Sequence, residues 1–249
     1  VLRDGKNAGV LERDEISHDA IVKLMVGRDI ERFYKPASDM TANDSIGVRD
    51  LRTRRYPNSP ISFDVRKGEI LGFAGLVGAG RSDAAQAIFG VDVPVSGQVS
   101  IDDKVIRISS AQDAIRNGIF LIPEDRRNAG LILDIPIREN ITLPALSRYS
   151  SSGLVKKVAE CKKAQEMCEK LNVKTPSIET KAANLSGGNQ QKVVLAKWLS
   201  LEPKLLIFDE PTRGIDVGAK AEIYRLLEDL AAQGKAIIVI SSELPEVLR

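Results

Sequence analysis

The sequence has 249 residues, of which 43% are hydrophobic and 28% are charged, a composition typical of a folded globular protein. Its 36 basic and 34 acidic residues give a formal net charge of +2, so no strong field attracts nucleic acid, and we expect no nucleic-acid partner. The longest apolar runs, such as 236–240, are far shorter than the roughly 18 residues that a membrane-spanning helix needs. A spanning segment is therefore excluded.

Residues 1–37 are predicted to lie outside the main folded unit. Residues 1–37 begin in an extended segment and continue as a helix that Ser17 would cap and Gly27 would end. Residues 38–45 have little apolar material and form the best linker candidate, so a new unit begins at about residue 46. The sequence does not start with Met, and we expect it to be part of a longer chain.

From residue 46 onward, apolar strands alternate with amphipathic helices, the pattern of an α/β sheet with crossover helices. The expected strands are 69–74, 98–101, 105–108, 119–122, 205–208 and 236–240, and the expected helices include 82–89 and 219–233. The last two strands are continuous apolar runs, as in buried parallel sheets. Asp102, Asp103 and Lys104 predict a hairpin turn between strands 98–101 and 105–108.

The stretch 126–184 has helical rather than strand character. Its helix is predicted to bury one face, formed by Val155, Val158, Ala159, Met167, Cys168 and Leu171. Cys161 and Cys168 are about 10 Å apart along such a helix, beyond the reach of a disulfide. We expect both cysteines to be free and to pack as small apolar residues in a reducing compartment.

A glycine-rich segment joins the expected strand 69–74 to the helix that follows it. It contains Gly75, Gly78, Ala79, Gly80, Arg81 and Ser82, which match a phosphate-binding loop except that Arg81 stands where Lys is expected. Glycines let the backbone N–H groups of such a loop converge on phosphate oxygens, and the helix N-terminus adds a favourable dipole. An ordinary glycine-rich turn is the alternative interpretation of this segment alone.

Two carboxylates end the apolar strand 205–208. Asp209 and Glu210 would lie beside the glycine-rich loop, because ligands collect at the carboxyl ends of parallel strands. Asp209 is a candidate Mg²⁺ ligand together with Ser82, and Glu210 is a candidate for polarising an attacking water. A pair of solvated acids is the alternative, but it leaves the nearby loop unexplained.

The third motif runs from Leu185 to Lys192 and precedes an apolar helix. Ser186, Gly187 and Gly188 would present a hydroxyl and two unobstructed N–H groups at a helix N-terminus, which suits a phosphate. The simpler interpretation is that Ser186 caps the helix through its side chain, and we expect that capping in either case.

In this order the three motifs resemble those of ATP-binding cassette (ABC) ATPases across residues 46–249. The segments 75–81, 123–127 and 211–216 are similar to the second cassette of bacterial monosaccharide importers, whose ATPase subunit holds two cassettes in one polypeptide. The resemblance implies an α/β fold of the P-loop NTPase class, with a mostly parallel core sheet, an antiparallel β part and an inserted helical subdomain.

The resemblance also implies a division of the chain. Residues 46–125 and 185–249 would form the core, residues 126–184 would form the helical subdomain, and residues 1–37 would be the end of the first cassette. Final strands expected after Ser242 are missing from this sequence, so we expect the C-terminal end of the fold to be incomplete.

By the same resemblance the cofactors are ATP and Mg²⁺, with Mg²⁺ held by Ser82 and Asp209. Glu124 occupies the position of the usual Gln and Ser242 that of the switch His, so both are candidate catalytic positions beside Glu210. Tyr56 is a candidate for stacking on adenine, with ordinary packing as the alternative. Asp216 is expected to link the two nucleotide sites, or else to cap a helix. His18, the single histidine, has no catalytic role.

Cassettes of this family pair head to tail, each ATP lying between one phosphate loop and the other cassette's signature motif. The implied partners are the first cassette of the same subunit, membrane permease subunits facing residues 133–146 and, indirectly, a sugar-binding protein outside the membrane. The implied location is the cytoplasmic face of the cell membrane. The altered loop predicts weak hydrolysis by this half alone. A non-hydrolysing regulatory cassette is the alternative, and a DNA-repair ATPase is disfavoured because no heptad coiled coil is present.

Overall fold

A computed structural model describes residues 2–3, 6–16, 20, 24, 45–151, 153–215 and 217–247. Two short strands, β1 (Leu2–Arg3) and β2 (Lys6–Asn7), form an antiparallel pair near the N-terminus. The predicted helix after Ser17 and the linker 38–45 lie almost wholly outside the described residues, as do His18 and Asp216. The proposed division into tail, linker and cassette therefore stays a prediction.

Four parallel strands form the centre of the fold. Their order is β5 (Ile70–Ala74), β12 (Ala236–Ser241), β11 (Leu205–Asp209) and β8 (Ile119–Ile122). All residues of β8, β11 and β12 are buried, because helices cover both faces of a parallel sheet. The predicted parallel strands are confirmed, and β11 and β12 each extend one residue further than expected, to Asp209 and Ser241.

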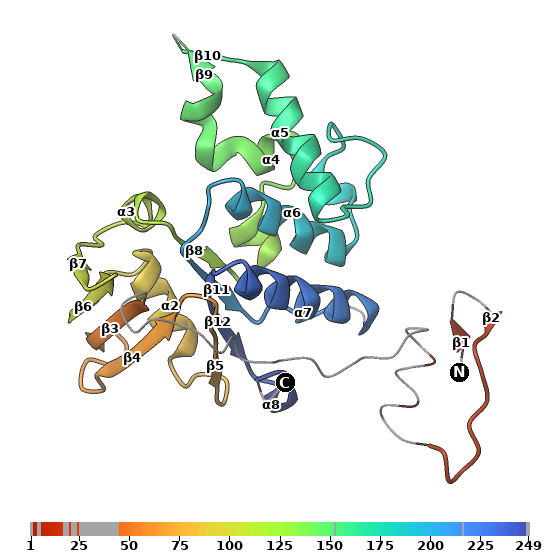
Figure 1. Cartoon of the computed structure of the whole chain (residues 1–249), viewed down its shortest axis with the longest axis horizontal. Coiled ribbons are helices and arrows are strands. Elements are labelled where there is room, and N and C mark those ends of the chain that lie inside the picture. The colour runs from red at the N-terminus through yellow and green to blue at the C-terminus, as the bar shows by residue number, and fades with distance from the viewer. Residues whose placement is uncertain are drawn as a thin grey trace.

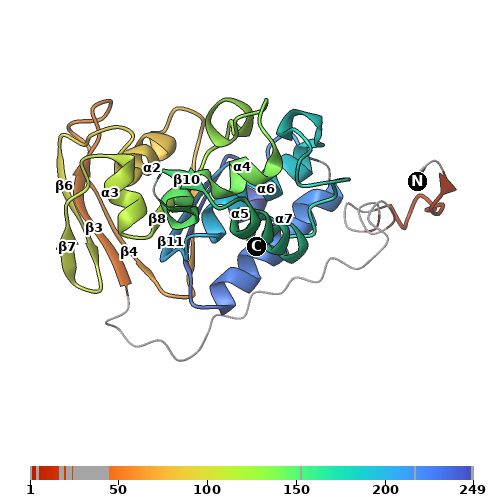
Figure 2. The same cartoon turned by 90° about the horizontal axis from the view of Figure 1, so that it is seen from above.

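A second, antiparallel sheet has the order β4 (Ile61–Arg66), β3 (Ser45–Arg52), β6 (Ser96–Ile101) and β7 (Lys104–Ile106). The predicted hairpin is confirmed: Asp102 and Asp103 turn the chain with positive φ angles of 50° and 61°, as tight hairpin turns require. Lys104, expected in the turn, instead pairs with Ile101 and begins β7, which ends at Ile106 and not at 108. Phe63 of β4 and Phe73 of β5 meet edge to face, with ring centroids 5.0 Å apart, and join the two sheets. Figure 2 shows this antiparallel sheet at one side of the parallel strands.

Helices pack around the parallel sheet. They are α2 (Arg81–Phe89), α3 (Ala111–Arg116), α6 (Gly187–Leu199), α7 (Val217–Ala232) and α8 (Leu244–Val247). Trp198 of α6 stacks on Phe120 of β8 at 5.2 Å between centroids and meets Phe89 of α2 edge to face at 6.0 Å. These aromatic contacts place α6 and α2 against the same strand, and so bring two sequence-distant motifs to one sheet.

Residues 126–184 are mainly helical. They contain the π-helix η1 (Arg126–Gly130), α4 (Ile137–Thr142), the 3-10 segment η2 (Leu143–Tyr149), the short strands β9 (Ser150–Ser151) and β10 (Leu154–Val155), α5 (Lys157–Lys170) and η3 (Ala182–Asn184). Figure 1 shows α4 and α5 stacked beyond α6, away from both sheets. Helix α4 contacts both α5 and α6, so this layer rests on the core through α6.

The predicted buried face of α5 is only half right. Met167, Cys168 and Leu171 are buried as expected, but Val155, Val158 and Ala159 are exposed, Val158 to 85%. Val155 lies in β10, before the helix starts.

Glu160, a charged residue, is buried on α5 where the apolar pattern predicted Val158 and Ala159. Glu160 is buried, pairs with the buried Arg138 of α4 and accepts a hydrogen bond of 2.6 Å from Thr142. The buried face of α5 is therefore rotated towards this ion pair. Such a charge can be buried because it is both paired and hydrogen-bonded.

Both cysteines are free, as predicted. Cys161 is half-buried and Cys168 is buried. Burial raises the pKa of the Cys168 thiol to about 11, so this thiol stays protonated and behaves as an apolar packing group.

Candidate functional site

The glycine-rich loop between β5 and α2 adopts a conformation that needs glycine. Gly78 and Gly80 both have φ angles of 86°, in the left-handed region. The ring of Tyr56 covers Gly80 so closely that a Cβ there would lie 2.7 Å from Tyr56 Cε2. The Tyr56 hydroxyl also donates a hydrogen bond to the carbonyl of Gly78. Tyr56 thus braces the loop, and its proposed stacking on adenine stays a prediction.

Ser82 and Asp209 meet where α2 begins and β11 ends. The Ser82 hydroxyl donates a hydrogen bond of 3.0 Å to Asp209 Oδ1. Burial raises the pKa of the Asp209 carboxyl, and the Ser82 hydrogen bond opposes that rise. A hydroxyl and a carboxylate oxygen side by side are the hard ligands that Mg²⁺ prefers, so these residues fit the ion.

Glu210 is held from two sides. Arg81 Nη2 lies 3.6 Å from Glu210 Oε1, and the Ser242 hydroxyl donates a hydrogen bond of 3.2 Å to Glu210 Oε2. Arg81 also donates to the carbonyl of Ser241 at the end of β12. Glu210 itself has a positive φ of 47°, an uncommon backbone conformation for a residue with a side chain. Unusual backbone at a fixed carboxylate is typical of functional sites.

A cavity of about 310 Å³ opens over the loop and these side chains. Its lining residues are Arg55, Val77, Gly78, Ala79, Gly80, Arg81, Ser82, Asp83, Glu124, Glu210, Arg213, Ser242 and Glu243. The structure therefore brings together the predicted loop, Glu124, Glu210 and Ser242, which come from four segments of the chain. Gly75 lies at the base of the loop, where a Cβ would be 3.6 Å from Arg81 Cδ. Asp209 is buried at the strand end below, bonded to Ser82.

The third motif does not line this cavity. Gly187 and Gly188 open α6, and the guanidinium of Arg126 covers Gly187 so closely that a Cβ there would lie 2.6 Å from Arg126 Nη2. Arg126 Nη1 donates to the carbonyl of Arg213 at 3.2 Å. Burial lowers the pKa of Arg126, and the charge of Arg127 lowers it further. A partly desolvated cation therefore lies against the motif.

The expectation that Ser186 caps α6 through its side chain is wrong. Ser186 is at the N-cap position, but its hydroxyl makes no hydrogen bond to the N–H groups of the first turn. Its oxygen accepts instead from Asn189 Nδ2 at 3.0 Å. The backbone N–H groups of the first turn are thus not taken up by this side chain.

Comparison with known proteins decides the family. A model described as "ABC transporter" matches residues 59–213, which include the glycine-rich loop, the third motif and the acidic strand end. The chain belongs to the ABC transporter family.

Curated relatives align with this ABC chain over its whole length. It is 46% identical to the xylose import ATP-binding protein XylG of Moorella thermoacetica and 49% identical to the ribose import ATP-binding protein RbsA of Clostridium perfringens strain SM101. The chain spans about half the length of these curated relatives, 50% in both cases.

Solved structures confirm the predicted fold class, a P-loop ABC fold with parallel and antiparallel sheets. MJ0796, a bacterial ABC transporter cassette solved in a dimeric structure, matches with a TM-score of 0.67 at 23% identity, covering 82% of this chain and 90% of that one. MJ1267, an ATP-binding cassette of an ABC transporter in its ADP conformation, matches with a TM-score of 0.64 at 20% identity, covering 80% of this chain and 81% of that one. At these identities the likeness supports the fold alone.

Sequence reasoning missed four charged residues that line the cavity of this ABC fold: Arg55, Asp83, Arg213 and Glu243. Arg213 sits inside the segment 211–216 that carried the family resemblance, which was the one available signal. Arg55 precedes Tyr56 and pairs with Asp83 at 3.8 Å. Their ion pairs join residues far apart in the sequence, so no local pattern identified them.

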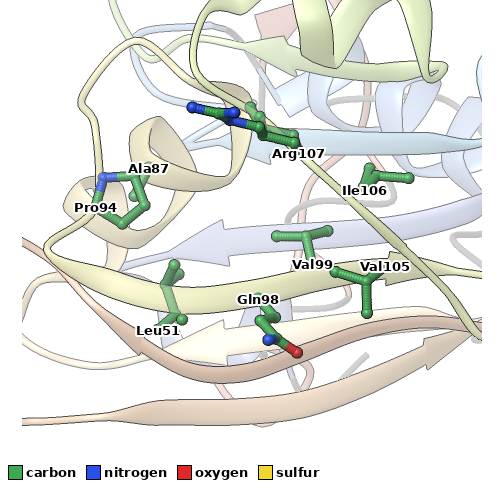
Figure 3. Close-up of a pocket in the computed structure, with 10 residues that line it drawn as sticks. Leu51, Ala87, Pro94, Gln98, Val99, Val105, Ile106 and Arg107 are labelled. Atoms are coloured by element: carbon green, nitrogen blue, oxygen red, sulfur yellow. The ribbon is translucent and has the colours of Figure 1, made fainter.

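Another hollow of about 310 Å³ lies beside the antiparallel sheet. Figure 3 shows it lined mostly by apolar side chains, with Arg107 at one edge. It has neither the loop conformation nor the paired carboxylates of the first cavity, so it is a poor phosphate site.

Within the part of the chain that the structure describes, no cluster of three or more His, Cys, Asp or Glu side chains could hold a metal ion. Over the same residues, no helix has the length and apolar character needed to cross a membrane.

Proposed function

We propose that the chain is the second, C-terminal ATP-binding cassette of a monosaccharide importer's ATPase subunit. It would bind ATP with Mg²⁺ and help to power sugar import through membrane permease subunits at the cytoplasmic face of the membrane. The proposal is supported by relatives named as ribose and xylose import ATP-binding proteins and by the half of their length that this chain spans. A sugar-binding protein would be an indirect partner.

The observation that carries the proposal is the convergence of the loop, Ser82 and Glu210 on one cavity, with the buried Asp209 bonded to Ser82. In this assignment Gly75, Gly78, Ala79, Gly80 and Arg81 contact phosphates, and Ser82 and Asp209 hold Mg²⁺. The metal would supply charge neutralisation at the phosphate oxygens. Glu210 would orient a water, with Glu124 and Ser242 in the positions of its usual Gln and His partners.

The second part of the proposal concerns pairing with the first cassette. Ser186, Gly187 and Gly188 would complete the nucleotide site built on that cassette's own loop, with Asp216 as a link between the two sites. Two observations support this pairing. The motif lies outside the cavity, and the side chain of Ser186 does not cap the first N–H groups of α6. Residues 126–184 would be the inserted helical subdomain, whose segment 133–146 faces the permease.

A regulatory cassette that binds nucleotide without hydrolysing it is the second candidate. It is favoured by Arg81, whose guanidinium is engaged by Glu210 and by the Ser241 carbonyl. The chain would then have an altered site that holds nucleotide while turnover occurs at the other site.

The test is a titration of the chain with ATP and Mg²⁺, followed by turnover of the full-length subunit with one cassette's glutamate changed to Gln at a time. We expect Mg²⁺-dependent ATP binding, and most of the turnover lost when the first cassette's glutamate is changed. Loss of turnover on changing Glu210 alone would exclude the regulatory candidate. A chain that binds no nucleotide would refute the proposal.

A further inference from the structure

The carboxylates that line the cavity are all paired with cations. Asp83 pairs with Arg55 at 3.8 Å, and Glu210 pairs with Arg81 at 3.6 Å. Glu243 accepts from Lys220 at 3.0 Å. The fourth carboxylate, Glu124, forms an ion pair with Arg213. A cavity lined by four acids is therefore internally neutralised before any ligand enters.

The pair of Glu124 and Arg213 is built by the sheet. Glu124 follows β8 and Arg213 follows β11, two neighbouring parallel strands in which Ile122 lies opposite Phe208. The two side chains come together across 89 positions of sequence. Among the described residues, no second cation lies within ion-pair distance of Glu124. Arg213 is thus the single partner that the structure supplies for this acid.

Glu124 is also the acid whose presence needs an explanation. The resemblance to ABC ATPases places an uncharged Gln at this position, and a carboxylate facing a polyphosphate repels it. A neighbouring guanidinium cancels that charge, so that Glu124 and Arg213 together present no net charge to the ligand. Arg81 cannot take this role, because Glu210 and the Ser241 carbonyl already engage it.

We propose that Arg213 neutralises Glu124 and thereby makes the cavity able to bind a nucleoside triphosphate. This inference rests on the proposed function and adds a residue that sets the site's affinity for polyphosphate. Glu124 and Arg213 act as one unit: the acid is tolerated at the site because the arginine is paired with it.

The experiment is a double-mutant cycle on ATP affinity, with Arg213→Gln, Glu124→Gln and the double variant. Arg213→Gln exposes the carboxylate and should weaken ATP binding about tenfold, with a smaller loss for ADP because it carries one phosphate fewer. The double variant should return to within about twofold of the wild type, since neither charge remains. Glu124→Gln alone should bind ATP at least as tightly as the wild type.

Arg127→Gln is the matched control, because it removes the same charge from an exposed neighbour of Glu124. It should change ATP affinity by less than about twofold. An Arg213→Gln variant with wild-type affinity, or a double variant as weak as Arg213→Gln, would overturn the inference. If Arg213→Gln did not fold, weaker ATP binding by Glu124→Gln would still refute it. A wild-type chain without any ATP binding would refute the proposed function as well, so the two failures are distinguishable.

Discussion

The Ser82 hydroxyl donates a hydrogen bond of 3.0 Å to Asp209 Oδ1 and so ties the start of α2 to the end of β11, across 127 positions of sequence. Ser82 lines the cavity, and this contact places the buried carboxylate of Asp209 directly beside its hydroxyl. It leads to a prediction about Asp209, whose pKa burial raises.

Asp209→Asn should stabilise the nucleotide-free chain at pH 7 while removing the Mg²⁺ dependence of ATP binding. The pKa of the Asp209 carboxyl is higher in the folded chain than in the unfolded chain. As the pH rises above 3.8, the unfolded chain therefore releases this proton first, and the wild type loses stability as the pH rises further. We expect the melting temperature to rise at pH 7 and to match the wild type at acid pH. Thermal unfolding and ATP titration with and without Mg²⁺ measure both effects.

Asp229→Asn on the exposed face of α7 is the control for that variant and should change neither quantity. Mg²⁺-dependent ATP binding that persisted in Asp209→Asn would remove Asp209 from the proposed metal site.

Arg81→Lys alone should not restore ATP turnover. Arginine here serves both the Ser241 carbonyl and Glu210, and the compact ammonium of lysine cannot reproduce that planar, two-sided contact. Glu124 and Ser242 would still stand in place of the usual water-positioning residues. We expect phosphate release by the isolated chain to stay far below the enzyme median of about 10 per second.

The informative comparison is a triple variant, Arg81→Lys with Glu124→Gln and Ser242→His, assayed beside the single one. A large gain from Arg81→Lys by itself would contradict the water-positioning argument.

Ser186→Arg should leave the fold and the chain's own ATP affinity unchanged, yet abolish most turnover of the full-length subunit. Its hydroxyl contacts Asn189 and caps nothing, so the substitution costs little stability. In the proposed head-to-tail pairing, the long side chain would fill the space that the first cassette's nucleotide enters. Steady-state turnover of the subunit and ATP titration of the chain provide the two readouts.

Ser151→Arg, at the exposed position of strand β9, is the matched control and should preserve turnover. Normal turnover in Ser186→Arg, or lost ATP affinity of the mutant chain, would argue against the head-to-tail arrangement.

Glu246→Gln should weaken the fold at neutral pH and flatten its acid dependence. Oε1 of Glu246 accepts from Thr212, from Lys220 at 3.2 Å and from Tyr224 at 2.6 Å, while Oε2 accepts from Ser241 at 2.7 Å. Burial alone would raise the pKa of Glu246, but these hydrogen bonds outweigh it and lower that pKa below 4.5. Stability from Glu246 is therefore present above pH 4.5 and lost as the pH falls through the lowered pKa.

We expect Glu246→Gln to lower the free energy of unfolding by about 1–3 kcal/mol at pH 7, measured by urea denaturation, with a smaller difference below pH 4. The exposed Glu202→Gln serves as the control. An equal loss at both pH values would mean that the carboxylate charge is not what stabilises this contact.

Much of the fold could be predicted because its signals are local. The strand 119–122 was predicted to the residue, and the helix after the glycine-rich loop ends at Gly90, whose φ of 75° needs glycine. Apolar runs, turn residues and contiguous motifs depend on neighbours along the chain. These local signals were enough to predict the element types, the candidate loop and the family resemblance from the sequence.

Partner choice between distant segments was decided by the tertiary structure alone. The sequence predicted a buried Val158, but an ion pair of Glu160 with Arg138 sets which face of α5 turns inward. It predicted a serine cap at Ser186, but a nearby amide takes the hydroxyl instead. Likewise, only the adjacency of β8 and β11 brings Arg213 to Glu124, because strand order, which no local pattern encodes, determines which charges meet.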